Sequence, residues 1–211
     1  MQTEQFVITN EDNMELMARY PDNHFDLAIV DPPYGIDVTK MNMGSRKTLR
    51  PDKSKSWDKN PPDQKYFNEL FRVSENKIIW GGNYFELPCS QYFAIWDKGE
   101  TIYGTDFAEC EYAWVRKGGT RIFKVTPNQL DRIHPTQKPV KLYEWLLKNY
   151  SEEGQKILDT HLGSGSIAIA IDRMNKFEKT GLHLTACELD KDYYDAAIKR
   201  IKQQTRQQTI F

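Results

Sequence analysis

Three features are scarce in this sequence of 211 residues, and each scarcity excludes a class of protein. Only three cysteines occur, Cys89, Cys110 and Cys187, and none are spaced as Cys-x-x-Cys, so neither a disulfide framework nor a metal site is expected. We expect these thiols to be buried. No apolar run approaches the roughly 18 residues of a membrane span, and Met1 to Gln5 lack the pattern of a leader peptide. We therefore predict a soluble, cytoplasmic protein without a membrane partner.

The net charge is also small, at −1, but the charged residues are unevenly distributed along the chain. Residues 40–60 contain seven basic side chains and two acidic ones, and residues 114–141 contain seven basic and one acidic, so the rest of the chain is acidic. Two basic segments on an acidic body fit a polyanion bound on one face. The alternative is that both segments are solvated loops. The candidate nucleic-acid contacts are Lys40, Arg46, Lys47, Arg50, Lys53, Lys55, Arg116, Lys117 and Arg121.

The apolar periodicity predicts strands and helices in alternation. With 39% hydrophobic residues, the chain can bury one sizeable core, and its length fits a single α/β domain with a mostly parallel, doubly wound sheet. The polar segment from about 38 to 63 has little periodicity and is expected to be a long, mobile loop. We expect strands at 5–8, 25–30, 77–80, 92–96, 111–115, 156–159 and 183–187, and helices capped by Asn10 and at 64–73, 139–150, 167–174 and 191–203.

A glycine-rich turn follows the predicted strand at 156–159, with the sequence Asp159-Thr160-His161-Leu162-Gly163-Ser164-Gly165-Ser166. Glycine lets a ligand approach the backbone closely. Glu188, at the end of the next strand, can accept hydrogen bonds from both ribose hydroxyls of an adenosine. The six-position dinucleotide fingerprint is not matched, because its third glycine is missing after Gly163 and Gly165, which disfavours a nicotinamide cofactor. The turn therefore predicts a nucleoside-bearing cofactor; the alternative is a structural turn with incidental glycines.

A second motif, Asp31-Pro32-Pro33-Tyr34-Gly35, follows the apolar strand at 25–30, at the sheet edge where ligands usually bind. The exocyclic amino nitrogen of adenine or cytosine is a poor nucleophile because its lone pair is delocalised into the ring. Acceptors that hold both N–H groups favour a pyramidal, reactive nitrogen. Asp31 and the Pro32 carbonyl can supply these acceptors, and Tyr34 offers a face for a base rotated out of the duplex. A proline turn without catalytic function is the alternative.

These two motifs, with His134-Pro135-Thr136-Gln137-Lys138-Pro139 between them, resemble those of the beta class of DNA amino-methyltransferases, in which the catalytic block precedes the cofactor block. The resemblance spans nearly the whole chain. It implies one Rossmann-like methyltransferase domain over residues 1–211, with a catalytic half at about 1–133 and a cofactor half at about 134–211. The implied sheet has seven strands and ends in an antiparallel hairpin. The implied cofactor is S-adenosyl-L-methionine, the partner is double-stranded DNA, and the host cell is bacterial.

The resemblance also implies roles for individual residues. The catalytic residues would be Asp31, Pro32, Pro33 and Tyr34. The segment at 134–139 would fold over the methionine part of the cofactor, with Thr136 and Lys138 as polar contacts. The full set of implied cofactor residues is His134, Thr136, Lys138, Asp159, His161, Gly163, Ser164, Gly165, Ser166 and Glu188.

Two departures from the family pattern affect these expectations. Thr160 and His161 replace the usual proline and phenylalanine, although His161 can still pack flat against the ligand. Only residues 118–133 remain for sequence recognition, so specificity is expected to be short, loose, or shared with the loop at 40–60 or another subunit. A homodimer or a partner specificity subunit is therefore a candidate assembly.

The target of methylation has several candidates. An aspartate rather than a serine at the start of the tetrapeptide favours N6 of adenine over N4 of cytosine. RNA, a protein side-chain amide and a catalytically inactive nucleic-acid-binding subunit remain as alternatives, and the basic segments argue against protein. Carbon-5 methylation through Cys89 is rejected, because the chemistry of the tetrapeptide is noncovalent.

Overall fold

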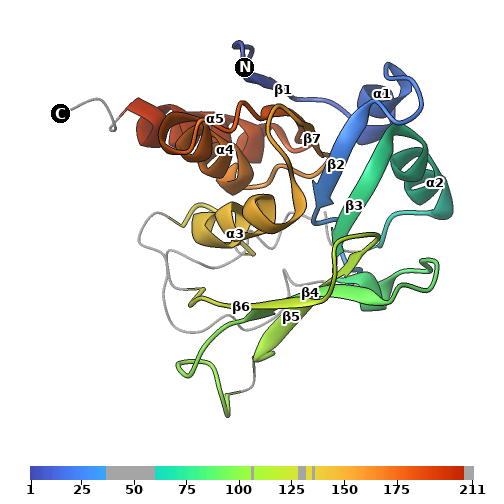
Figure 1. The fold of residues 1–211 in the computed structure, drawn as a ribbon, viewed down its shortest axis with the longest axis vertical. Helices are drawn as coiled ribbons and strands as arrows, with labels where there is room; N and C mark the ends of the chain where they lie inside the picture. The colour runs from blue at the N-terminus through green and yellow to red at the C-terminus, as the bar shows by residue number, and fades with distance from the viewer. Residues whose placement is uncertain (37–59, 106, 128–131, 135, 207–211) are drawn as a thin grey trace.

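The computed structural model describes residues 1–36, 60–105, 107–127, 132–134 and 136–206 (Figure 1). Strands and helices alternate through most of this part. In chain order the elements are β1 (Phe6–Thr9), α1 (Asn13–Ala18), β2 (Phe25–Val30), α2 (Gln64–Val73), β3 (Ser74–Trp80), the 3₁₀ turn η3 (Gly82–Tyr84), β4 (Tyr92–Asp97), β5 (Cys110–Val115), β6 (Arg121–Lys124), α3 (Val140–Tyr150), β7 (Lys156–Asp159), α4 (Ser166–Phe177), β8 (His183–Cys187) and α5 (Lys191–Arg206).

In the described residues the strands form one sheet of eight, in the order β1-β8-β7-β2-β3-β5-β4-β6. The five strands from β1 to β3 are parallel, whereas β5 is antiparallel to both β3 and β4. The predicted mostly parallel, doubly wound sheet with an antiparallel hairpin is confirmed. The predicted number of seven strands is wrong. The chain turns at Gly118 and Gly119, both at positive φ, and Arg121–Lys124 then pairs in parallel with β4 as an eighth strand outside the hairpin.

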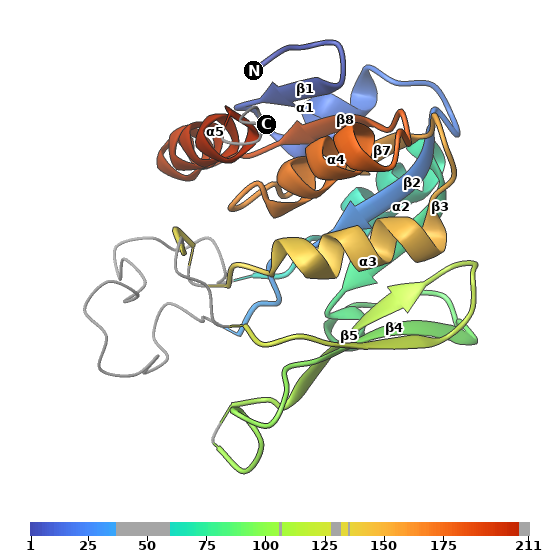
Figure 2. The same cartoon turned by 60° about the vertical axis from the view of Figure 1, so that its left-hand side comes forward.

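Helices cover both faces of the parallel part of the sheet (Figures 1 and 2). One core lies between the sheet and α3, α4 and α5, and the other lies against α1 and α2. Leu27 and Ile29 of β2 point into the first core, and Ala28 and Val30 point into the second. Burial on both faces explains why β2 is an apolar run rather than an alternating pattern.

Two local predictions need correction. The N-cap of α1 is Asp12, whose carboxylate accepts a hydrogen bond from the Met14 N–H at 2.8 Å. Asn10 instead ties the end of β1 to the end of β8, because its side-chain amide donates to the carbonyls of Glu188 and Leu189 at 2.7 and 3.0 Å. Of the three thiols, only that of Cys187 is buried, and Cys89 and Cys110 are exposed.

The parallel strands all end at the same edge of the sheet. The register aligns Thr9 with Cys187 and Val30 with Ile79, so the residues that follow β1, β8, β7, β2 and β3 lie side by side. In an open α/β sheet this edge is where ligands bind. Within the ranges that the structure describes, no helix is long and apolar enough to cross a membrane.

Candidate active site

A cavity of about 680 Å³ opens at this edge of the sheet. Pockets of roughly 300–1,000 Å³ are typical of small-molecule and cofactor sites. The cavity brings together residues from all three predicted motifs. Those that line it are Asp31, Pro33, His134, Thr136, Lys138, His161, Gly163, Ser164 and Glu188. Pro32, Tyr34, Asp159, Gly165 and Ser166 are not among the lining residues, but each adjoins or is hydrogen-bonded to one that is.

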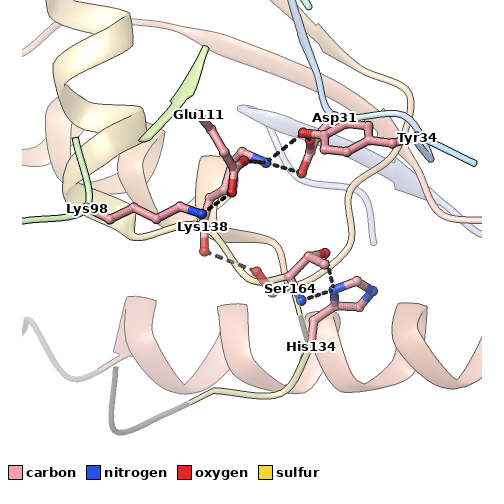
Figure 3. A network of polar contacts seen from close by, with 9 residues as sticks. Asp31, Tyr34, Lys98, Glu111, His134, Lys138 and Ser164 are labelled. Atoms are coloured by element: carbon pink, nitrogen blue, oxygen red, sulfur yellow. Dashed lines mark hydrogen bonds and ion pairs between the residues drawn. The ribbon is translucent and has the colours of Figure 1, made fainter. Parts of the chain in front are cut away.

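Asp31, the predicted catalytic carboxylate, lies at one end of the cavity, called the catalytic end below. Its Oδ1 accepts a hydrogen bond from the Tyr34 hydroxyl at 2.7 Å, and its Oδ2 accepts one from the Lys138 ammonium at 2.5 Å (Figure 3). Burial raises the pKa of Asp31, and the positive charge of Lys138 opposes that rise. Burial and the charge of Asp31 also raise the pKa of Tyr34, so its hydroxyl stays protonated and remains a donor. Lys138 was expected to contact the cofactor, and here it pairs with the predicted catalytic carboxylate.

The ring of Tyr34 is enclosed by neighbouring aromatics. Tyr84 stacks on it with 4.9 Å between ring centroids and 12° between planes, and Phe85 approaches it edge-on at 6.1 Å. Gly81 lies against the same ring, where an added Cβ would come within 2.3 Å of Cε1 of Tyr34. The face of Tyr34 that Tyr84 covers is therefore not open to a base in this structure.

The glycine turn forms the other end of the cavity through backbone groups. The Gly163 N–H donates to one carboxylate oxygen of Glu188 at 2.9 Å, and the Asp190 N–H donates to the other at 3.0 Å. Gly163 has a φ of +52°, and an added Cβ would meet only the His161 carbonyl, at 3.8 Å, so the space above it is open. Burial raises the pKa of Glu188, whereas these backbone hydrogen bonds oppose that rise. The carboxylate is thus fixed at the cavity wall.

The second glycine of the turn and the serine after it have structural roles. A Cβ on Gly165 would lie 2.7 Å from Cδ1 of Ile201, so α5 packs directly on the turn. The guanidinium of Arg200, a buried residue of α5, donates to the Ser164 carbonyl at 3.0 Å and to the Ser166 hydroxyl at 3.2 Å. These contacts brace the turn from behind, away from the cavity.

His161 is held as a neutral ring. The side-chain amide of Asn13 donates to its Nε2 at 3.2 Å, which leaves Nδ1 to carry the proton toward the Thr160 hydroxyl at 2.9 Å. Burial lowers the pKa of His161 to about 3, in agreement with this tautomer. Its neighbour Asp159 accepts the His161 backbone N–H at 2.9 Å, and burial raises the pKa of Asp159 to about 8.

His134, Thr136 and Lys138, which belong to the segment predicted to cover the cofactor (the cover segment), all line the cavity. Nδ1 of His134 accepts the Thr136 backbone N–H at 3.3 Å and lies 3.1 Å from the Thr136 hydroxyl. The His134 ring packs edge-on against Tyr193 of α5 with 4.4 Å between centroids. Both ends of this cover are thereby attached to the molecule, because Lys138 is paired with Asp31.

Several cavity residues were missed from the sequence. Three of them, Glu11, Asn13 and Met14, come after β1, and their signal was available, because the residues after a parallel strand lie at the ligand-binding edge. Tyr66 of α2 and Tyr193 of α5 also line the cavity, and no local motif marks them. Glu111 and Lys98, which Figure 3 shows beside Lys138, come from the antiparallel part of the sheet and carry no motif.

The predicted DNA contacts fall into two groups. Lys40, Arg46, Lys47, Arg50, Lys53 and Lys55 lie outside the described residues. Arg116 and Lys117 follow β5, which runs antiparallel to β3, so they lie at the sheet end opposite the cavity; the Arg116 N–H donates to the Lys77 carbonyl at 3.0 Å. Arg121 starts β6 opposite Ala94, in line with Trp80 at the end of β3, but three strands farther out in the sheet, and it does not line the cavity. The structure therefore does not bring these three basic residues to the site.

Comparisons with known proteins agree with this architecture. A family model described as DNA methylase matches residues 79–199. The protein YubD of Escherichia coli (strain K12), provisionally named a methylase, is 24% identical across 90% of this chain and 87% of its own length. The Type II methyltransferase M.BglII of Bacillus subtilis is also 24% identical, across 90% of this chain and 67% of its own.

Solved structures share the fold. The M1.HpyAVI–SAM complex aligns with a TM-score of 0.56 and 17% identity over 92% of this chain and 99% of that one. The cytosine-N4-specific PvuII DNA methyltransferase aligns with a TM-score of 0.59 and 12% identity over 98% and 93% of the two chains. Fold and site together define a Rossmann-like methyltransferase. Because the family model covers more than half of the chain, the chain belongs to the DNA amino-methyltransferase family, and the predicted membership is confirmed.

Proposed function

We propose that this protein uses S-adenosyl-L-methionine to methylate N6 of adenine in double-stranded DNA. The observation that carries this proposal is the single cavity that joins Asp31 to Gly163 and Glu188. An amino group held at Asp31 and a nucleoside held at Glu188 would share one enclosed space. Family membership supports the reaction, and the SAM complex of the structural neighbour M1.HpyAVI supports the cofactor.

The residues present fit this cofactor. The open space above Gly163 would admit a ligand close to the backbone. The Glu188 carboxylate offers about four lone-pair positions, and backbone N–H groups such as those of Gly163 and Asp190 do not fill all of them, so acceptor positions remain for ribose hydroxyls. His134 and Thr136 also line the cavity, and the methionine part would lie against them. S-adenosyl-L-methionine supplies a methyl group on a positively charged sulfur, and transfer to the amino nitrogen leaves a neutral thioether and releases one proton.

Within this scheme the tetrapeptide holds the amino group. Asp31 accepts one amino N–H and is the nearest base for the released proton, and the Pro32 carbonyl accepts the other N–H. Tyr34 fixes one oxygen of Asp31 through its hydroxyl. Acceptors that are already in place need no rearrangement as charge develops on the amino nitrogen. The burial of Pro32 and the rigid proline backbone keep the acceptors fixed.

One observation favours a second candidate, N4 of cytosine, because the PvuII enzyme with the same fold is cytosine-N4-specific. We prefer adenine because the tetrapeptide of this chain begins with aspartate rather than serine. We also propose that the catalytic and cofactor halves form one domain. In the sheet, β7 and β8 of the second half lie between β1 and β2 of the first, so the strands of the first half form one sheet only through those of the second.

The test is to incubate the purified protein with labelled S-adenosyl-L-methionine and unmethylated genomic DNA, and to identify methylated nucleosides by mass spectrometry. We expect N6-methyladenine. N4-methylcytosine would preserve the mechanism and correct the base. Cofactor binding without methylation of DNA would redirect the proposal to RNA or to a required partner subunit. Absence of cofactor binding would contradict it in favour of an inactive nucleic-acid-binding subunit.

A further inference from the structure

The ammonium of Lys138 lies between two carboxylates that come from distant parts of the chain (Figure 3). Its Nζ is 2.5 Å from Oδ2 of Asp31 and 3.2 Å from Oε2 of Glu111. Glu111 in turn pairs with Lys98, whose Nζ is 2.8 Å from Oε1 of Glu111. The Lys138 side chain is only 3% exposed, and its ammonium lies 5.0 Å from the centre of the Trp80 ring. These four charged residues, of which Lys138 is buried and the others are partly buried, form one chain of ion pairs that ends at the proposed catalytic carboxylate.

Charge balance alone does not explain the outer pair, Glu111 and Lys98. A buried ammonium requires a counter-charge, and Asp31 already supplies one for Lys138. Glu111 adds a second negative charge, and Lys98 compensates it, so the four residues together are neutral. The outer pair therefore adds no net charge. Its contribution is a second acceptor, on the side of Lys138 away from Asp31, that fixes where the ammonium lies.

We propose that Glu111, held by Lys98, is a positioning residue for the methyl-transfer site, and this rests on the proposed function. Glu111 restrains the Lys138 ammonium on Oδ2 of Asp31. A carboxylate offers about four lone-pair positions, two on each oxygen. Lys138 uses one on Oδ2 and Tyr34 uses one on Oδ1, so one position on each oxygen remains for the amino group. Without the restraint, Lys138 would compete with the base for these positions.

The charges acting on Asp31 come from several elements and make the proposal testable. The charged groups are Lys138 on the cover segment, Glu111 on β5 and Asp159 on β7, and the neutral hydroxyls of Tyr34 and of Tyr143 on α3 are the other titratable groups near Asp31. The charge of Lys138 lowers the pKa of Asp31, and the charge of Glu111 raises it. Glu111→Gln should therefore lower the pKa of Asp31. Lys98→Met should raise it, because an uncompensated Glu111 draws Lys138 away from Asp31.

The experiment is a titration of the ¹³C-labelled Asp31 carboxyl by NMR in the ligand-free protein, with the signal assigned by comparison with Asp31→Asn. We expect the midpoint to move to lower pH in Glu111→Gln and to higher pH in Lys98→Met. Glu100→Gln is the matched control, because Glu100 is 77% exposed in its ion pair with Lys124, and it should leave the midpoint unchanged. Lys98→Arg keeps the positive charge and should give the wild-type midpoint. Circular dichroism checks that each variant folds, and should Lys98→Met unfold, Glu111→Gln and Lys98→Arg carry the test.

The same variants are then compared in single-turnover methylation. In Glu111→Gln we expect a rate about tenfold lower at saturating cofactor, as loss of one charged hydrogen bond allows, with an unchanged Kd for S-adenosyl-L-methionine. Midpoints that do not move, or that move in the same direction in both variants, would overturn the positioning role even if the protein methylates DNA. Opposite shifts in a protein that methylates no DNA would leave the positioning role standing and refute the proposed function.

Discussion

The two ends of the cavity are built by different means. At the catalytic end, Asp31 is held by charged and hydroxyl side chains, including Lys138 from 107 residues further along the chain. At the cofactor end, Glu188 is held by the backbone N–H groups of Gly163 and Asp190, within a stretch of 28 residues from Gly163 to Asp190. The first end depends on tertiary packing and on protonation, whereas the second depends on the local course of the chain.

This difference predicts different weaknesses. A side-chain network fails when one charge is removed, because a partner is left buried and unpaired. Backbone N–H groups keep their positions through many side-chain substitutions, but they lose their hydrogen bonds when the turn itself is displaced. Substitutions at the catalytic end should therefore reduce the rate of methyl transfer, and substitutions at the cofactor end should reduce cofactor affinity. Single substitutions at each end, and in the contacts that support them, test that separation.

Asp31→Ala should have the largest effect. We expect the single-turnover rate to fall by at least about 10²–10³-fold, the usual loss when a preorganised electrostatic contact is removed. The Kd for S-adenosyl-L-methionine, measured by calorimetry, should change little. Because Lys138 loses a partner, thermal unfolding must be recorded beside the rate, with Asp31→Asn as the control that keeps the side-chain shape. Near-normal methylation by the folded alanine variant would contradict the assignment of Asp31.

Glu188→Gln should have the reverse effect, with a loss of cofactor affinity and little change in rate. The amide keeps the shape of the side chain but removes its charge and one of its two acceptor oxygens, so we expect cofactor affinity to fall by about 10–100-fold, as loss of a charged hydrogen bond predicts. At saturating cofactor the single-turnover rate should stay within a few fold of wild type. Calorimetry and rapid-quench kinetics on the same preparation separate the two quantities. An unchanged affinity would show that Glu188 does not bind the cofactor.

Arg200→Met tests the brace behind the glycine turn. Arg200 is 4% exposed and donates to Ser164 and Ser166, so its loss leaves two acceptors without this partner. We expect a loss of about 2 kcal/mol in the free energy of unfolding, or roughly 4–8 °C in Tm for a chain of this size. Lys199→Met, at the exposed neighbouring position, is the matched control and should leave Tm unchanged. Equal Tm values for the two variants would show that the turn does not need the brace.

The smallest effect at neutral pH is that of His161, whose contribution to stability changes only on acidification. The pKa of His161 is about 3 in the folded protein, below its ordinary value near 6.5, so the unfolded chain binds the extra proton first. Stability should therefore fall as pH drops from about 6.5 toward 3, by at most about 1.4 kcal/mol per pH unit from this residue. His161→Gln should remove that contribution. Urea unfolding of both proteins at several pH values measures it, and parallel pH dependences would refute a buried neutral His161.

The same contrast explains which features of the fold and the site could be predicted from the sequence alone. The parallel strands, the helices on both faces and the residues of the cofactor turn were predicted, because each is encoded by local periodicity and by strand-end motifs. Lys98 and Glu111 were not, because only the pairing of β4 with β5 brings them to Lys138. The strand β6 was missed because four residues after a glycine pair carry no clear alternation. The charge of Arg116 and Lys117 suggested a contact with DNA, but the sequence did not reveal the direction of β5. Because β5 runs antiparallel to β3, these residues lie away from the cavity.

The most direct test of two separable ends is to measure, side by side, the single-turnover methylation rate and the S-adenosyl-L-methionine Kd of Asp31→Ala and Glu188→Gln. We predict that the first variant loses rate and keeps affinity, and that the second loses affinity and keeps rate at saturation. If both quantities fell together in both variants, the cavity would not have two separable ends, and the assignment of acceptor and cofactor roles would be contradicted.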